Sequence, residues 1–374
     1  MRRILVISNV TSGLYSFRYE LIQRLVQEFE VFIMANDNGR ADEFTKLGCT
    51  FIETAFDRHS INPVKEVKLF SMYIKLIRNV RPDIVLTYTI KPNIYAGMVC
   101  ALLGIPYIAN ITGLGTAVEK GGIIQKIAII LYKIGLRRAQ MVFFQNSENR
   151  DFMLNHGIIK GAYGTIPGSG VNLQKYKPLE YPNGETTDFV FIGRIMKEKG
   201  IDQYIDAAKY IRGKYPQTRF HICGAFEENY GEQMKELQDS GIILYHGVVK
   251  DMISLYQIAS CTIHPSYYPE GLSNVLLESC ACARPIITTN RAGCREVVDD
   301  GVNGFICKQK DSEDLIKQIE KFIALPYEKK KQMGLAGRAK VEKKFDRNIV
   351  VEAYLKEIER ILNISPKSRA RDTY

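Results

Sequence analysis

Residues 188–200 read DFVFIGRIMKEKG, and this stretch decides which fold the sequence predicts. The apolar run 189–192 is typical of a buried parallel strand, and the glycine and arginine at 193–194 end it before a helical pattern begins. The preceding segment, 175–187, is polar and contains two prolines and a glycine, which is the composition of a linker. A second α/β unit therefore begins at about residue 188.

The same alternation of strands and helices occurs on both sides of this linker. Strands are expected at 3–8, 30–35, 49–53, 83–88, 106–110, 141–145, 219–223, 242–245, 261–264 and 285–288. Alternation of this kind predicts parallel sheets, and 374 residues are too many for one ordinary core. We therefore expect an α/β protein of two doubly wound, Rossmann-like domains facing across a cleft. We place the domains at 1–175 and 186–345; in 346–374 a helix packs back on the first domain and precedes a disordered tail.

Composition excludes several classes of protein. The chain is 46% hydrophobic and 25% charged, which is globular, and it contains no apolar run long enough to cross a membrane. The apolar residues after Met1 form too short a run for a signal peptide and predict a first strand instead. The eight cysteines lie mostly in apolar runs without the spacing of a zinc site. We expect a reducing, cytoplasmic compartment and no metal.

Residues 269–278, PEGLSNVLLE, place two carboxylates, Glu270 and Glu278, on either side of a glycine turn that opens a helix. Unpaired N–H groups at a helix N-terminus attract phosphate, and carboxylates accept hydrogen bonds from sugar hydroxyls. This combination suits a ligand that is half phosphate and half polyol, such as a sugar nucleotide. Two glutamates at this spacing also occur by chance, so the spacing alone does not decide the question.

The turn at 193–200 carries two cations, Arg194 and Lys199, across the exit of the predicted strand. Both can reach a single diphosphate, Arg194 with a forked contact and Lys199 with a point charge. The alternative is an ordinary charged loop in solvent.

These motifs resemble those of a known family. Residues 269–278 resemble the Glu-x7-Glu motif of retaining GT-B glycosyltransferases of the family 4 type, and 193–200 resemble their phosphate loop, G-R-x-x-x-x-K-G. The blocks at 290–298 and 301–305 resemble further motifs of that family. In the first half, short motifs resemble bacterial transferases that extend lipid-linked oligosaccharides for capsule, O-antigen or protein glycosylation; they lie at 13–18, 91–93 and 112–115.

The resemblance implies roles for individual residues. Arg194 and Lys199 would bind the donor diphosphate with help from the backbone of Gly13, and Glu278 would bind the ribose. Glu270 would hold the transferred sugar, so that Glu270, Arg194 and Lys199 form the catalytic set. The remaining donor contacts implied are Val248 at the base and the N–H groups of Gly271, Leu272, Ser273 and Asn274 at the sugar and distal phosphate.

The acceptor side is less well marked. The candidates are Ser12, Arg18, Lys91 and Thr112. Many relatives carry a His-Gly pair where this chain has Thr112-Gly113, a departure that bears on how the acceptor is positioned.

The expected reaction is retaining transfer of a hexose or N-acetylhexosamine from a UDP-sugar to a saccharide, expected to be linked to a polyprenyl diphosphate. The N-terminal domain would bind the acceptor and the C-terminal domain the nucleotide sugar. No Asp-x-Asp pair occurs, so we expect a metal-independent enzyme without a cofactor. The alternatives are a GT-B UDP-sugar 2-epimerase and a catalytically inactive membrane-surface binding protein of the same fold.

The net charge of +10 lies mostly in the first half of the chain. Nucleic acid is not an expected partner because no recognition motif accompanies the charge. Two predicted helices, 62–80 and 122–136, carry basic stripes, so we expect a peripheral protein on the anionic inner face of the plasma membrane, beside its acceptor. The alternative is a solvated basic surface on ordinary core helices. The basic residues of the two stripes are Lys65, Lys68, Lys75, Arg78, Lys126, Lys133 and Arg137.

Overall fold

The computed structural model describes residues 1–54, 62–115, 118 and 121–363. The chain divides into two compact units: one contains Met1–Ser169 and the chain from Asn348 onward, and the other contains Gly170–Arg347. Residues 170–175, which the sequence analysis assigned to the first domain, group with the second. The reason is backbone pairing: the N–H of Val171 donates to Phe345 (2.8 Å), and the N–H of Arg347 donates to Val171 (3.1 Å).

The first unit is built on a parallel sheet of seven strands in the order β3-β2-β1-β4-β5-β6-β7. Its strands are β1 (Arg3–Val10), β2 (Glu30–Asn36), β3 (Thr50–Glu53), β4 (Ile84–Tyr88), β5 (Tyr107–Ile111), β6 (Met141–Phe144) and β7 (Tyr163–Thr165). Strands β4, β5 and β6 are buried at every position, as expected for parallel strands covered on both faces.

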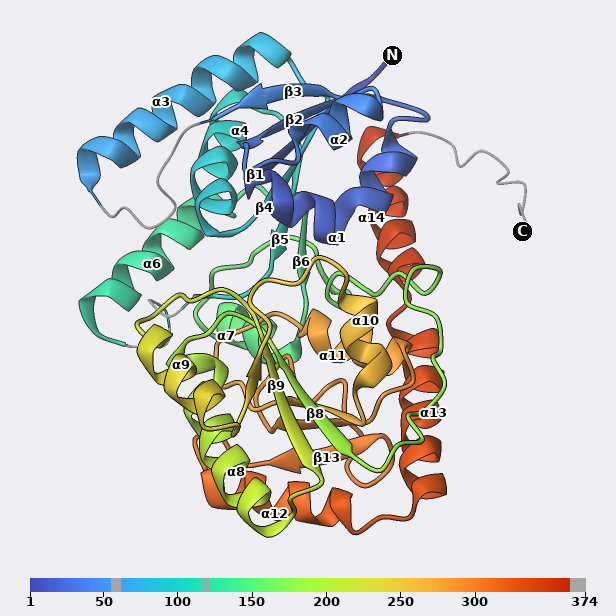
Figure 1. Ribbon diagram of the computed structural model, residues 1–374. Helices are drawn as coiled ribbons and strands as arrows, with labels where there is room; N and C mark the ends of the chain where they lie inside the picture. Colours follow the sequence, from blue (N-terminus) through green and yellow to red (C-terminus); the bar gives the residue numbers. More distant parts are fainter. Residues whose placement is uncertain (55–61, 116–117, 119–120, 364–374) are drawn as a thin grey trace. The chain divides into compact units, whose positions relative to one another are not determined.

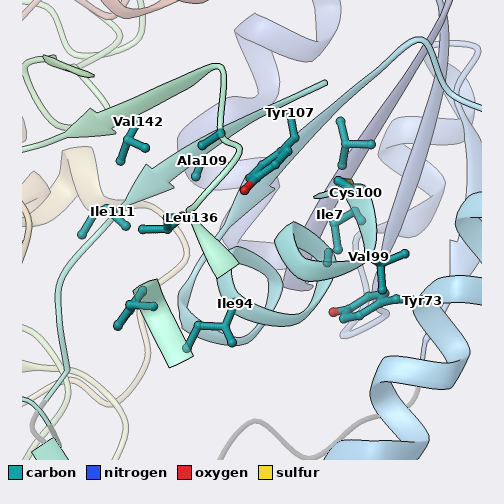
Figure 2. Close-up of a cluster of buried hydrophobic side chains, with 14 of the residues drawn as sticks. Ile7, Tyr73, Ile94, Val99, Cys100, Tyr107, Ala109, Ile111, Leu136 and Val142 are labelled. Atoms are coloured by element: carbon teal, nitrogen blue, oxygen red, sulfur yellow. The ribbon is translucent and has the colours of Figure 1, made fainter. Parts of the chain in front are cut away.

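Helices cover both faces of this sheet (Figure 1). They are α1 (Thr11–Leu25), α2 (Ala41–Lys46), α3 (Pro63–Val80), the π-helical turn η1 (Pro92–Ala96), α4 (Gly97–Leu103), α6 (Gly122–Gly135), α7 (Ser147–Asn155) and α14 (Arg347–Leu362). On one face, Leu5 and Ile7 of β1 pack with residues of α3, η1, α4 and α6; Figure 2 shows part of this cluster, including Tyr73 and Tyr107. On the other, Ile4 and Val6 pack against α1, α2 and α14.

The C-terminal helix α14 belongs to the first unit. Its buried side chains Val350, Tyr354 and Ile358 lie one turn apart in the core formed with α1 and β1. The Tyr354 hydroxyl accepts a hydrogen bond of 2.8 Å from the side-chain amide of Asn110 in β5. The expected disordered tail, 365–374, lies outside the described residues.

The second unit has a parallel sheet of six strands in the order β10-β9-β8-β11-β12-β13. The strands are β8 (Thr187–Ile192), β9 (Thr218–Cys223), β10 (Leu244–Tyr245), β11 (Cys261–His264), β12 (Ile286–Thr289) and β13 (Gly304–Cys307). The helical segments are η2 (Lys197–Lys199), α8 (Ile201–Lys214), α9 (Gly231–Asp239), α10 (Met252–Ile258), α11 (Asn274–Ala281), α12 (Ser312–Ile323) and α13 (Tyr327–Lys344). Phe189 and Phe191 face α8, α9 and α12, whereas Val190 and Ile192 face α10 and α11.

In both sheets the strand order reverses direction beside the first strand of the unit. This switch point lies between β1 and β4 in the first unit and between β8 and β11 in the second. Open α/β sheets bind ligands beyond the carboxyl ends of the strands at such a point. The loops that leave these four strands are therefore the natural places to look for a site.

Two local features position residues that the sequence singled out. Helix α1 begins at Thr11, directly after β1, so Ser12 and Gly13 lie in its first turn. The helix after β4 begins with the π-helical turn η1, which contains Pro92 and Asn93. Asn93 explains this turn: its side chain is buried, accepts from the Thr87 hydroxyl (2.7 Å) and donates to the carbonyl of Asn110 (2.7 Å).

Candidate donor-binding site

The basic loop after β8 begins where two glycines meet. Gly193 follows β8 and Gly224 follows β9, and the Gly193 N–H donates to Cys223 at 3.0 Å. A Cβ atom added to Gly224 would lie 1.7 Å from the Gly193 carbonyl oxygen, so only glycine allows the two strand exits to approach this closely. This contact fixes the direction in which Arg194 leaves the sheet.

A third glycine, Gly200, places Lys199 against the exit of β11. Gly200 has a φ of +78°, and a Cβ atom there would lie 2.2 Å from the carbonyl oxygen of Pro265. Both the left-handed backbone and the lack of space exclude other residues. The loop after β8 and the loop after β11 are thereby packed together at the switch point.

Lys199 forms an ion pair with Glu270 across this contact. The side chains are only 12% and 13% exposed, so both charges are largely removed from water. Burial lowers the pKa of Lys199 to about 8, and the positive charge of Arg194 contributes to the shift. The Ser266 hydroxyl lies 3.4 Å from Oε1 of Glu270. Two residues that the sequence singled out separately therefore come together from loops 71 residues apart.

His264, the last residue of β11, lies behind this pair. Its Nε2 atom is 3.7 Å from Oε1 of Glu270, and its ring is almost fully buried. Burial lowers the pKa of His264 to about 3, with a further contribution from Lys199, so the ring is neutral at physiological pH. In the sequence, His264 stands out only as the last residue of the expected strand 261–264.

Tyr268 is a site residue that the sequence analysis missed. Its ring centre lies 5.1 Å from the guanidinium carbon of Arg194 and 5.0 Å from Nζ of Lys199, so the ring contacts both cations. Arg194 also forms an ion pair of 3.2 Å with Glu227, and the side chain of Arg194 is 38% exposed. The sequence signal that could have identified Tyr268 is the position of this aromatic residue two places before Glu270.

The turn at Gly271–Asn274 differs in one respect from the prediction. The N–H of Ser273 was expected to bind ligand, but it donates to the carbonyl of Gly293 at 2.8 Å. Gly293 is held in turn by the side chain of Glu296, which accepts its N–H at 2.7 Å. The turn is therefore braced from behind, and the backbone of Ser273 is not available to a phosphate.

The N-terminus of α11 still offers hydrogen-bond donors. The helix begins at Asn274, and the N–H groups of its first turn have no partner within the helix. Ser273 is the residue before it, and its buried hydroxyl has no hydrogen-bond partner among the described atoms. Buried hydroxyl groups normally have partners, so this atom is an available donor or acceptor at the turn.

Glu278 lies further along α11, in a pocket of tyrosines. The Tyr256 hydroxyl donates to its carboxylate at 3.2 Å, and burial raises the pKa of Glu278 while hydrogen bonds from Tyr256 and Tyr176 oppose the shift. Val248 follows β10 and is 72% exposed. These two positions and the Lys199–Glu270 pair all belong to loops or helices that follow strands of the same sheet.

In the first unit, the predicted acceptor residues mostly lie at the corresponding sheet edge but are engaged in local contacts. Ser12 donates its N–H to the side chain of Asn38 at 2.8 Å and accepts from it at 2.7 Å. Lys91 forms an ion pair of 2.7 Å with Glu66 of α3, and both side chains are largely buried. Thr112 directly follows β5 and is partly exposed.

Arg18 does not fit the prediction of an acceptor contact. It is 3% exposed, and its guanidinium carbon lies 5.0 Å from the ring centre of Tyr88 and 5.9 Å from that of Tyr354. Helix α1 turns this residue inward because it begins at Thr11. Arg18 therefore packs α1 against the sheet and α14 instead of facing a ligand.

Two features of the described part of the chain bear on metals and membranes. Among residues 1–54, 62–115, 118 and 121–363, no three His, Cys, Asp or Glu side chains gather in an arrangement that could hold a metal ion. Over the same residues, no helix has both the length and the apolar character required to cross a bilayer.

Two parallel Rossmann-like domains in succession, the second with paired charges at its switch point, define the GT-B class of protein. Two family models match the chain: "Glycosyl transferase 4-like" over residues 3–146 and "Glycosyl transferases group 1" over residues 175–340. The two matches together take in most of the chain, one in each half. The chain therefore combines a glycosyltransferase 4-like domain with a group 1 glycosyltransferase domain.

Individual relatives agree with this assignment. A Campylobacter jejuni enzyme named N,N'-diacetylbacillosaminyl-diphospho-undecaprenol alpha-1,3-N-acetylgalactosaminyltransferase is 27% identical over 96% of this chain and 99% of its own. A Staphylococcus aureus capsular polysaccharide biosynthesis glycosyltransferase, CapM, is 33% identical over 43% of each chain. The crystal structure of Anabaena HepE with UDP and glucose has a TM-score of 0.79 at 15% identity, covering 96% of this chain and 100% of that one.

Proposed function

We propose that this glycosyltransferase moves a hexose or N-acetylhexosamine from a UDP-sugar, with retention, to a saccharide linked to a polyprenyl diphosphate. The observation that carries the proposal is the buried Lys199–Glu270 pair beside Arg194 and Tyr268 at the switch point of the second domain. The name of the Campylobacter relative, which the chain matches over nearly its whole length, supports a lipid-linked acceptor and favours an N-acetylhexosamine. The reaction would take place at the cytoplasmic face of the plasma membrane.

In this proposal the positive charges stabilise the departing diphosphate. Arg194 and Lys199 donate hydrogen bonds to it, and the N-terminal turn of α11 contributes its N–H groups. When Lys199 turns toward the phosphate, Glu270 becomes able to accept hydrogen bonds from hydroxyls of the transferred sugar. The leaving phosphate then takes the proton of the acceptor hydroxyl, so no side chain is required as a general base.

The two tyrosines around Glu278 fit a ribose site. The raised pKa of Glu278 makes its carboxylate a strong hydrogen-bond acceptor for two vicinal hydroxyls. Val248, at the exit of β10, would contact the base. Because Arg194 and Lys199 supply the charge that a divalent ion would otherwise supply, the reaction is proposed to need no metal and no cofactor.

The test is a donor screen with the purified full-length protein. UDP- and GDP-sugars are incubated with and without an undecaprenyl-diphosphate-linked saccharide, products are identified by mass spectrometry, and NMR of the new linkage reports its anomeric configuration. We expect transfer from a UDP-sugar with retention, unchanged by EDTA. Activity that vanished in EDTA and returned with Mn²⁺ or Mg²⁺ would contradict metal independence. Epimerised UDP-N-acetylglucosamine in the absence of acceptor would identify the alternative 2-epimerase.

A further inference from the structure

Helix α6 of the first domain exposes a stripe of isoleucines. Ile123, Ile127, Ile130 and Ile134 are spaced four, three and four residues apart, so they share one face of the helix. Their exposed fractions are 76%, 52%, 55% and 50%, and we call these four residues the isoleucine stripe. Single exposed apolar residues are common on protein surfaces, but four in register on one helix are not.

The opposite face of α6 is already buried. Tyr132 and Leu136 belong to the core of the first domain (Figure 2 shows Leu136 beside Ile111), and the Tyr107 hydroxyl donates to the carbonyl of Gly135 at 2.6 Å. A Cβ atom on Gly135 would lie 2.6 Å from Cα of Ile94, so helix and core are in close contact. The isoleucine stripe therefore does not contribute to the core of the first domain. The outer side of α6 therefore presents an apolar strip that the core of the first domain does not cover.

Basic residues flank the stripe. Lys126 and Lys133 are exposed on one side of it, and α6 contains no acidic residue. Helix α3 packs against the same face of the sheet and repeats this composition, with Val64 and Val67 63% and 66% exposed beside basic residues. The apolar stripe and its positive border thus lie on a surface that has the composition of an interfacial amphipathic helix.

We propose that α6 lies in the plane of an anionic bilayer surface with the isoleucine stripe inserted among the lipid chains and Lys126 and Lys133 at the headgroups. Charge complementarity favours lipid over a second copy of this chain. In a two-fold dimer the same patch would face itself, and the lysines of one α6 would approach those of the other with no acidic residue on either helix. The proposal goes beyond the transfer reaction, because it holds whichever sugar is transferred.

Vesicle flotation of the full-length protein, without donor or acceptor, tests this directly. The wild type should float with vesicles of phosphatidylglycerol and phosphatidylethanolamine. The double variant Ile127→Gln/Ile130→Gln should lower the partition coefficient at least tenfold. Glutamine is a good helix former, so the variant should keep its fold, which circular dichroism and thermal unfolding would verify.

The matched control is Val302→Gln/Leu335→Gln, two apolar residues of the second domain that are 57% and 42% exposed. It should bind vesicles like the wild type. Equal binding by the isoleucine variant and the wild type would overturn the proposal, and so would an equal loss in the control.

The lysines give a separate readout. Lys126→Gln/Lys133→Gln should weaken binding to anionic vesicles by about fivefold per lysine at low salt and leave binding to phosphatidylcholine vesicles unchanged.

Sedimentation in the absence of lipid tests the alternative that a second copy of this chain covers the stripe. A wild-type dimer that became a monomer on Ile127→Gln/Ile130→Gln, with no vesicle binding by either, would assign the stripe to a second copy. Vesicle binding without sugar transfer would leave this proposal standing and contradict the proposed function instead.

Discussion

The carboxyl edges of the two sheets have the same strand order around their switch points but are built differently. In the second domain, Arg194, Lys199 and Glu270 meet at one place, and Tyr268 contacts both cations. In the first domain, Ser12 and Lys91 are tied to Asn38 and Glu66 of the same domain, and Arg18 is buried. A shared fold therefore fixes where a site can form and leaves open whether its charges are gathered there.

An ion pair that is held away from water costs free energy, so its presence gives information about function. Removing an ion pair such as Lys199–Glu270 from water costs several kcal/mol per charge, and the attraction between the two charges offsets this cost only in part. A protein that needed only stability would place apolar residues there. Burial alone does not separate the two domains, because the Lys91–Glu66 pair of the first domain is just as little exposed. What distinguishes the second domain is that Arg194 and Tyr268 gather around its pair, which indicates a function for these charges.

The largest expected effect tests the cluster itself. Lys199→Ala or Glu270→Ala should lower the turnover of a UDP-sugar by about 10² to 10³, because each removes an oriented charge from the developing diphosphate or the sugar. Lys197→Ala is the matched control, since Lys197 is an exposed lysine two residues away in the same loop. Turnover near the wild-type rate in either site variant, with the fold intact, would refute the site.

A second prediction compares glycines at the two edges. Gly200→Ala should destabilise the second domain by about 2 to 3 kcal/mol, because its φ of +78° and the nearby Pro265 carbonyl leave no place for a Cβ atom. Gly13→Ala should leave stability unchanged or raise it slightly, because the nearest atom to its Cβ would be 3.7 Å away. Thermal unfolding of the two variants measures the difference, and equal melting temperatures would contradict it.

A third prediction concerns acid stability of the second domain. Burial acts to raise the pKa of Asp188 in β8, but hydrogen bonds from His221, Arg219 and Thr186 outweigh it and hold the value at about 2. The ordinary pKa of an aspartate is 3.8, so the unfolded state binds the proton first as the pH falls. The stability from this group is complete above about pH 4 and is lost toward pH 2; it amounts to about 2 kcal/mol.

Unfolding in urea between pH 5 and pH 2.5 checks this prediction. The wild type should lose stability more steeply with acid than Asp188→Asn, which cannot take up that proton. Parallel curves for the two proteins would show that Asp188 does not carry the effect.

The smallest effect is expected at the edge of the first domain. Thr112→Val should raise the KM for the acceptor a few-fold and leave the slow hydrolysis of donor alone unchanged, because the loop after β5 is proposed to touch only the acceptor. A variant that lost donor hydrolysis as well would show that the two edges do not divide the work in this way.

Much of the fold could be predicted from local patterns. An apolar run ending at Gly193 marks β8, and helix 62–80 was expected within one residue because Asn62 caps it and Pro63 follows. Motif resemblance placed Lys199 at the donor diphosphate and Glu270 at the transferred sugar, but it did not predict that the two side chains form an ion pair. Its contact depends on Gly200 approaching Pro265, which is a feature of packing between loops that are distant in sequence.

The predictions that failed depended on tertiary context. Arg18 resembles a surface cation in sequence, yet Tyr88 and Tyr354 enclose it, and Tyr354 comes from a helix more than 300 residues later in the chain. The N–H of Ser273 is taken by Gly293, another partner that no local pattern specifies. The isoleucine stripe was hidden for a related reason: the sequence shows an apolar helix but not which of its faces the core has already used.

The placement of α14 has a consequence for how the protein is made. Both ends of the described chain lie in the first domain, so the second domain is an insertion within it. During synthesis the second domain is complete once Arg347 has left the ribosome and can fold as a continuous segment. The first domain, by contrast, cannot complete its core until the last helix emerges. Until then, the hydrophobic surface that packs against Val350, Tyr354 and Ile358 stays exposed. The half that is made first is thus the half that finishes folding last.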